Sequence, residues 1–147
     1  MSIQNQLIDA MKVAMKAKES LRLNTIRMAR TALKNAEIEA RQELDDAAAI
    51  KILSTLVKQR REAADAYRET RPELAEKEEL ELAVLQEFLP AQLSAEEIEA
   101  LVARAIVESG ASSMKDMGAV MKLITPQTTG RADGKLVSGL VRNKLAG

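Results

Sequence analysis

Apolar residues in the first 90 positions recur three and four residues apart, which is the spacing of one face of an α-helix. Four helical segments are predicted from this pattern. Ser2 can cap the first, which breaks near 18–20. Asp45 and Asp46 can cap the third and place negative charge at its start, and it ends near Thr70. Pro72 suits the first turn of the fourth, and Pro90 stops it.

The clearest local signal follows that proline. Ser94 precedes an apolar-periodic stretch, and Glu97 stands three residues later, which is the pattern of a capping box. Leu93 and Ile98 are placed as the apolar pair that often flanks such a box. We expect a fifth helix that ends at 109–110, where glycine suits a left-handed cap.

Two further helices are expected near the C-terminus. The sixth carries Met114, Met117 and Met121, which we interpret as core residues, and ends at 125–126 because proline disfavours helix at the residue before it. A polar loop, QTTGRADG, follows. Helical spacing then resumes at Leu136.

These elements predict an all-α fold. The only aromatic residues are Tyr67 and Phe88, so the core must be built from aliphatic side chains and methionine. We expect residues 1–92 to form a four-helix up-and-down bundle and residues 93–147 to form a small three-helix subdomain carrying the GRADGK loop. A subdomain of that size should pack against the first part.

The amino-acid composition excludes several kinds of catalytic and metal site. The chain has no cysteine, hence no disulfide or thiolate metal site, and no histidine, the usual general base near neutral pH. We therefore expect no catalytic residues, no metal and no cofactor. No apolar run approaches the ~20 residues needed to span a bilayer, and the N-terminus is unlike a signal peptide. The expectation is a cytoplasmic protein without membrane contact.

Charge is neutral overall but segregated along the chain. Residues 1–36 hold seven Lys or Arg against two acids, and residues 73–99 hold nine Glu against one Lys. Residues 115–147 hold six Lys or Arg against two Asp. One interpretation is that these segments dock on each other; another is a polyanion-binding face beside an acidic face.

The GRADGK loop differs from a nucleotide-binding P-loop in its glycine spacing and in having Leu136 where Ser or Thr should follow. It could still bring a phosphate to the N-terminus of the last helix. The alternative is a plain turn between helices. The candidate nucleic-acid-binding residues are Lys122, Gly130, Arg131, Gly134, Lys135, Arg142 and Lys144, together with Lys58, Arg60 and Arg61 in the third helix.

Three stretches, KQRREAADAY (58–67), EFLPAQLSAEEIEALV (87–102) and DMGAVMKLITPQTTGRADGKLVSGLVRNKL (116–145), resemble the GatB/YqeY family. The family is named for the tail of the B subunit of tRNA-dependent amidotransferases, and this chain looks like a stand-alone YqeY-like member. The resemblance implies a multihelical fold and an association with amidation of misacylated tRNA. The catalytic part of the B subunit and the glutaminase have no counterpart here.

From the resemblance we expect a tRNA-binding or tRNA-associated accessory protein that is not catalytic alone. A label such as carbon–nitrogen ligase with glutamine as amido-N-donor would be inherited from the complex. The partners would be tRNA and an aminoacyl-tRNA synthetase or amidotransferase subunit. The alternative is a protein-interaction module that docks on such an enzyme through the Met-rich helix or the acidic fourth helix.

Overall fold

The computed structural model describes all 147 residues and contains helices only, which confirms the all-α prediction. Its contacts gather the chain into two compact units, Met1–Pro90 and Ala91–Gly147. The first unit contains α1 (Ile3–Ala17), α2 (Ser20–Ala40), α3 (Asp46–Tyr67) and α4 (Pro72–Gln86). The second contains α5 (Ala95–Ser109), a short 3₁₀ turn (Met114–Asp116), α6 (Met117–Thr128) and α7 (Gly134–Ala146).

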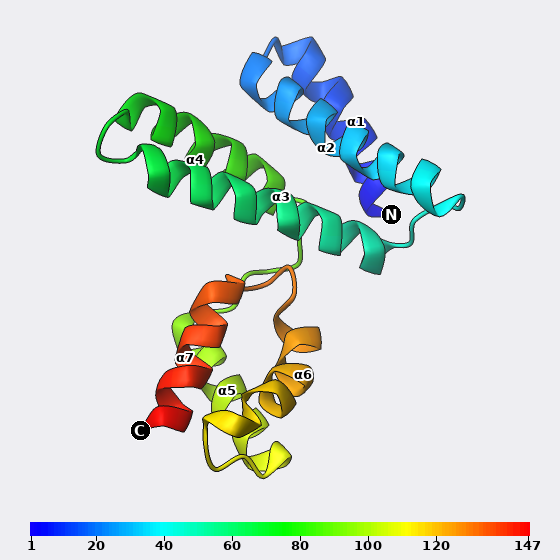
Figure 1. The fold of residues 1–147 in the computed structure, drawn as a ribbon. Helices are drawn as coiled ribbons and strands as arrows, with labels where there is room; N and C mark the ends of the chain where they lie inside the picture. The colour runs from blue at the N-terminus through cyan, green and yellow to red at the C-terminus, as the bar shows by residue number, and fades with distance from the viewer. The chain divides into compact units, whose positions relative to one another are not determined.

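The first unit consists of two helical hairpins, α1 with α2 and α3 with α4 (Figure 1). Helix α2 packs on both helices of the second hairpin, and α1 packs on α3, but α1 makes no contact with α4. The up-and-down bundle expected from the sequence is therefore not closed into a ring. A physical reason lies in the exposed face of α4, where Glu73, Glu76 and Glu79 leave little apolar surface for another helix.

The ends of these helices follow local rules. Ser2 Oγ accepts a hydrogen bond from the Asn5 amide, and Asp45 Oδ1 accepts one from the Ala48 amide, so both predicted caps are confirmed. Asp46 Oδ1 reaches across the unit and accepts from the Ile3 amide at 3.1 Å. Helices α1 and α2 end at Lys18 and Arg41, two non-glycine residues with φ of 59° and 57°.

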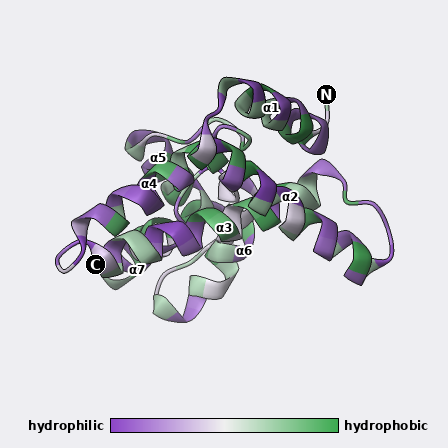
Figure 2. Cartoon of the chain, turned by 90° about the horizontal axis from the view of Figure 1, so that it is seen from above, coloured by the Kyte–Doolittle hydropathy of each residue, from purple (hydrophilic) through white to green (hydrophobic).

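The core of this unit is aliphatic, as its composition predicted. Each helix carries hydrophobic and hydrophilic residues interspersed along its length (Figure 2). The hydrophobic set meets inside, where the largest fully buried side chains are Leu7, Ile26, Leu33, Leu53 and Leu85. Phe88 joins this core, whereas Tyr67, the other aromatic residue, is exposed.

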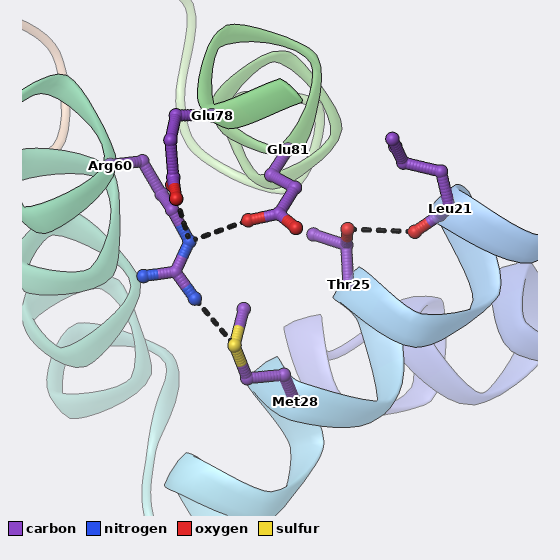
Figure 3. Close-up of polar contacts among 6 residues, drawn as sticks. All are labelled: Leu21, Thr25, Met28, Arg60, Glu78 and Glu81. Atoms are coloured by element: carbon purple, nitrogen blue, oxygen red, sulfur yellow. Dashed lines mark hydrogen bonds and ion pairs between the residues drawn. The ribbon is translucent and has the colours of Figure 1, made fainter. Parts of the chain in front are cut away.

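A polar cluster joins three helices of the first unit (Figure 3). Arg60 of α3 directs Nε to Glu81 Oε2 at 2.9 Å and to Glu78 Oε2 at 3.6 Å, both on α4. Its Nη2 points to the sulfur of Met28 on α2. The three charged side chains are only 16–23% exposed. The single guanidinium thus offsets one of the two negative charges and holds both glutamates where α3 packs on α4.

The second unit packs α5, α6 and α7 around its own core of small aliphatic residues. Fully buried side chains come from all three helices and include Val102, Val120, Ile124, Val137 and Val141. Met117 and Met121 pack against this core, as the sequence predicted, whereas Met114 is exposed.

Helix α6 continues past the expected stop. Pro126 lies inside its last turn, and the helix ends at Thr128. Threonine hydroxyls add side-chain hydrogen bonds around this turn, since Thr125 Oγ1 donates to the Met121 carbonyl and Thr129 Oγ1 donates to the Thr125 carbonyl. A proline in a terminal turn removes only one helical hydrogen bond, so the apolar face of α6 decides where the helix ends.

The capping box of α5 is formed as predicted. The Glu97 amide donates to Ser94 Oγ, and the Ser94 amide donates to Glu97 Oε1, both at 3.1 Å. The Ser94 amide and hydroxyl together hold the pKa of the Glu97 carboxyl below its ordinary value. The carboxylate is therefore the form that the fold stabilises.

We expect Ser94→Ala to lower the free energy of unfolding by about 1 kcal/mol, since an N-cap oxygen is lost. Urea denaturation followed by circular dichroism would measure it. Ser20→Ala is the matched control, because Ser20 is exposed in the first turn of α2 and the N-cap of that helix is Glu19. Equal effects of the two substitutions would contradict the role given to the capping box.

Arg60→Met keeps an apolar stem but removes the charge, and should destabilise the protein by about 2 kcal/mol, because Glu78 and Glu81 then face each other without a cation. Arg68→Met is the control, since Arg68 also bridges α3 and α4 but through exposed partners, Asp65 and Glu79. The control should change stability far less. The same urea titration compares them, and similar losses would refute the importance of the partly buried cluster.

Candidate nucleic-acid interface

The loop between α6 and α7 is a compact turn. The amides of Arg131 and Ala132 both donate to the carbonyl of Thr128, at 2.9 and 3.0 Å. Gly130 is buried and has φ of 77°, a left-handed conformation that glycine adopts without strain. Gly134, by contrast, begins α7 and is not among the glycines with positive φ.

Three hydrogen bonds tie this loop to the segment that enters the second unit. Gln92 Nε2 donates to the Gly130 carbonyl at 2.8 Å, and the Leu93 amide donates to the Arg131 carbonyl at 2.8 Å. Arg131 Nε donates to the Ala91 carbonyl at 3.1 Å. The guanidinium of Arg131 therefore has a structural role in addition to any contact with a ligand.

The expected phosphate position at the start of α7 is already occupied by a side chain of the loop. Asp133 is the N-cap of α7, and its Oδ1 accepts from the Lys135 amide at 3.1 Å. A carboxylate there satisfies the helix dipole and repels a second anion. An anion at the start of α7 would therefore compete with the Asp133 carboxylate for the Lys135 amide.

Most of the exposed cations of this unit lie on α6 and α7, while Arg104 is exposed on α5 and Lys115 in the 3₁₀ turn. Lys135 and Arg142 are exposed and two helical turns apart, so they share one stripe of α7 roughly 10 Å long. Lys144 lies about half a turn away from that stripe. Lys122 is exposed on α6, opposite the buried Val120. The structure therefore groups Lys135 with Arg142 but does not group Lys144 with them.

The acids of residues 115–147 are used locally, which leaves the positive surplus at the surface. Asp116 Oδ2 accepts from the amides of Ser112 and Ser113, at 2.9 and 3.3 Å. These amides, Ser112 first, hold the pKa of Asp116 below its usual range. Asp133 caps α7. Both carboxylates thus stabilise backbone turns.

The candidate residues of α3 have different surroundings. Arg60 is held by Glu78 and Glu81, so we remove it from the candidate interface. Lys58 is exposed, and Arg61 is half-buried. The sequence did not predict the acids around Arg60 because they belong to α4, about twenty positions further along the chain.

Sequence reasoning missed Gln92, whose amide spans to Gly130. A glutamine beside a proline gives no local signal, and its partner is 38 residues away. No group of three Asp or Glu side chains is close enough to hold a metal ion. None of the helices combines the length and the apolar character that a membrane span requires.

Together the two units define an all-helical protein whose C-terminal unit has exposed cations on α6 and α7 and a hydrogen-bonded glycine loop between these helices. The model of the family described as Yqey-like protein matches residues 4–145, so the chain belongs to the YqeY-like family. This confirms the resemblance found in the sequence motifs.

Curated relatives share one name, "Altered inheritance of mitochondria protein 41, mitochondrial". The protein of Eremothecium gossypii is 40% identical over 97 residues, which cover 65% of this chain and 52% of the relative. That of Lachancea thermotolerans is 36% identical, covering 67% and 54%. That of Kluyveromyces lactis is 30% identical over 133 residues, covering 88% and 68%. The chain spans about half the length of the first two relatives.

These names contradict the cytoplasmic location expected from the sequence, because the relatives are named as mitochondrial proteins. The expectation was wrong for a physical reason. It rested on the lack of cysteine and of long apolar runs, and neither property distinguishes one aqueous compartment from another.

The two loop glycines should differ sharply when replaced. Gly130→Ala places a β-carbon on left-handed backbone and should lower the unfolding free energy by about 1 kcal/mol. Gly134→Ala meets nothing within 4 Å and should leave stability nearly unchanged. Thermal melting of the two variants tests this, and a large loss from Gly134→Ala would contradict the geometry described here.

Proposed function

We propose that this protein is a tRNA-binding accessory protein of the amidotransferase type, which binds through its C-terminal unit. The supporting observation is the cationic outer surface of α6 and α7, where Lys122, Lys135 and Arg142 are exposed while Asp116 and Asp133 are engaged with backbone amides. The family's relation to the tail of the amidotransferase B subunit supports tRNA as the polyanion.

Lysine and arginine on helix surfaces contact phosphates without reading bases, so selectivity would come from the shape of the tRNA. The two aromatic residues argue against binding by extended base stacking, because Tyr67 and Phe88 both belong to the first unit and Phe88 is buried. The proposed role is to hold or position a tRNA, with the amidation chemistry supplied by a partner enzyme.

Within this role Arg131 has a different function from the one first expected. Its Nε holds the Ala91 carbonyl, so its removal loosens the loop and its effect on binding is mixed with its effect on folding. Lys122 and Lys135 are the better probes, since both side chains are exposed.

A second candidate function is docking on an aminoacyl-tRNA synthetase or amidotransferase subunit. Exposed apolar side chains beside the cations favour it: Leu123 follows Lys122 and Leu136 follows Lys135, with exposures of 38% and 49%. Salt separates the two functions, because counterion release makes tRNA binding steeply salt-dependent and apolar docking is not.

Lys122→Ala combined with Lys135→Ala should weaken binding of unfractionated tRNA and reduce the slope of log affinity against log salt by roughly 1 to 2 units, since two phosphate contacts are lost. Fluorescence anisotropy with labelled tRNA at several salt concentrations measures both. Lys51→Ala with Lys77→Ala is the control, removing two exposed lysines from α3 and α4. Equal losses in both variants, or no tRNA binding by the unmodified chain at low salt, would refute the proposal.

A further inference from the structure

A groove of about 710 Å³ runs along the α1–α2 hairpin, within the first unit. Its apolar lining comes from Leu7, Ile8, Met11, Met15 and Leu33. Met15 is 47% exposed although its neighbour in α1, Ala14, is fully buried. The hairpin thus leaves a methionine-containing apolar surface open to solvent.

Cations border this groove in a regular array. Arg27, Arg30 and Lys34 of α2 line it at spacings of three and four residues, so they form one stripe of two helical turns. Arg30 leans over the apolar surface, with Nη1 3.2 Å from Met11 Sδ. None of the three lies within 4.0 Å of a carboxylate oxygen, unlike Arg22, Arg60 and Arg68 of the same unit.

The single acid in the lining does not neutralise that stripe. Glu37 Oε2 accepts from the Leu44 amide at 3.0 Å and from Gln4 Nε2 at 3.2 Å. These two hydrogen bonds, that of the amide first, hold the pKa of Glu37 below its ordinary value. Its carboxylate closes the turn after α2 and also feels the charge of Lys34, so one acid faces three cations beside an apolar surface and Arg27 and Arg30 have no acid of their own.

We propose that this groove binds an acidic amphipathic helix of another protein. The lining extends from Gln4 to Met15 on α1 and from Arg27 to Glu37 on α2, which corresponds to about 15 Å, or three turns of a bound helix. Apolar residues of that helix would meet Met11 and Met15, whose side chains adapt to varied shapes. Carboxylates three, four or seven residues apart would match the cationic stripe.

Two other occupants fit less well. RNA phosphates would meet the cations but would leave the apolar lining of Leu7, Ile8 and Met11 uncovered. A second copy could offer its acidic α4, but Leu80 is the one large apolar side chain that α4 exposes, so it would leave most of the apolar surface uncovered. Both occupants are outcomes that the experiment below distinguishes.

The probe is a labelled synthetic helical peptide with leucines along one face and glutamates on its flank, compared with the same peptide carrying lysine for glutamate. Fluorescence anisotropy with the full chain should show binding of the acidic peptide only. Arg27→Glu with Arg30→Glu should weaken that binding at least tenfold. Lys12→Glu with Lys16→Glu is the matched control, since it reverses two exposed cations of the same hairpin outside the groove, and should cause a much smaller change.

Circular dichroism melting establishes that each variant folds. Failure of the acidic peptide to bind, equal binding of both peptides, or equal losses in the two charge-reversed variants would overturn the proposal. The groove would be assigned to nucleic acid by two results together. tRNA would displace the peptide, and Arg27→Glu with Arg30→Glu would abolish tRNA binding. Sedimentation showing self-association that Arg27→Glu with Arg30→Glu abolishes would assign it to a second copy.

Discussion

Three hydrogen bonds between residues 91–93 and residues 130–131 are the constraint on which the second unit depends. They join the segment that enters the unit to the loop between its last two helices, and so fix the start of α5 relative to α7. Without them the small core of valines and isoleucines would have to hold three short helices unaided, which is difficult in a unit of this size. The GRADGK residues therefore stabilise the fold of the second unit, whatever they contribute to binding.

Several charged side chains also stabilise the fold. Asp116, Asp133 and Glu97 satisfy amides at helix starts, and Glu37 closes a turn, so these carboxylates serve the backbone. Arg60 serves the packing of α3 on α4. The remaining exposed charges differ in sign from one surface to another. Cations lie on α6 and α7 and along the α1–α2 groove, whereas glutamates lie on α4. A chain of zero net charge thus presents separate faces of opposite sign.

Sequence reasoning succeeded where the controlling interaction spans a few residues. Caps at Ser2, Asp45 and Ser94, and the aliphatic face of each helix, follow from spacing and side-chain chemistry alone. It failed where partners are distant: Arg60 finds its acids on another helix, and Gln92 finds its carbonyl 38 residues away. It also gave Pro126 too much weight, because packing of the α6 face outweighs the loss of one helical hydrogen bond.

The left-handed residues Lys18 and Arg41 have a consequence for how the molecule tolerates change. Each holds a side chain on backbone that glycine would occupy with less strain, at a cost of up to about 1 kcal/mol per position. The free energy of unfolding of the first unit is thus lower than it would be with glycine at these two positions. These two helix ends lie away from the core and from the Arg27–Arg30–Lys34 stripe. Stabilising replacements there can therefore offset destabilising substitutions elsewhere in the chain.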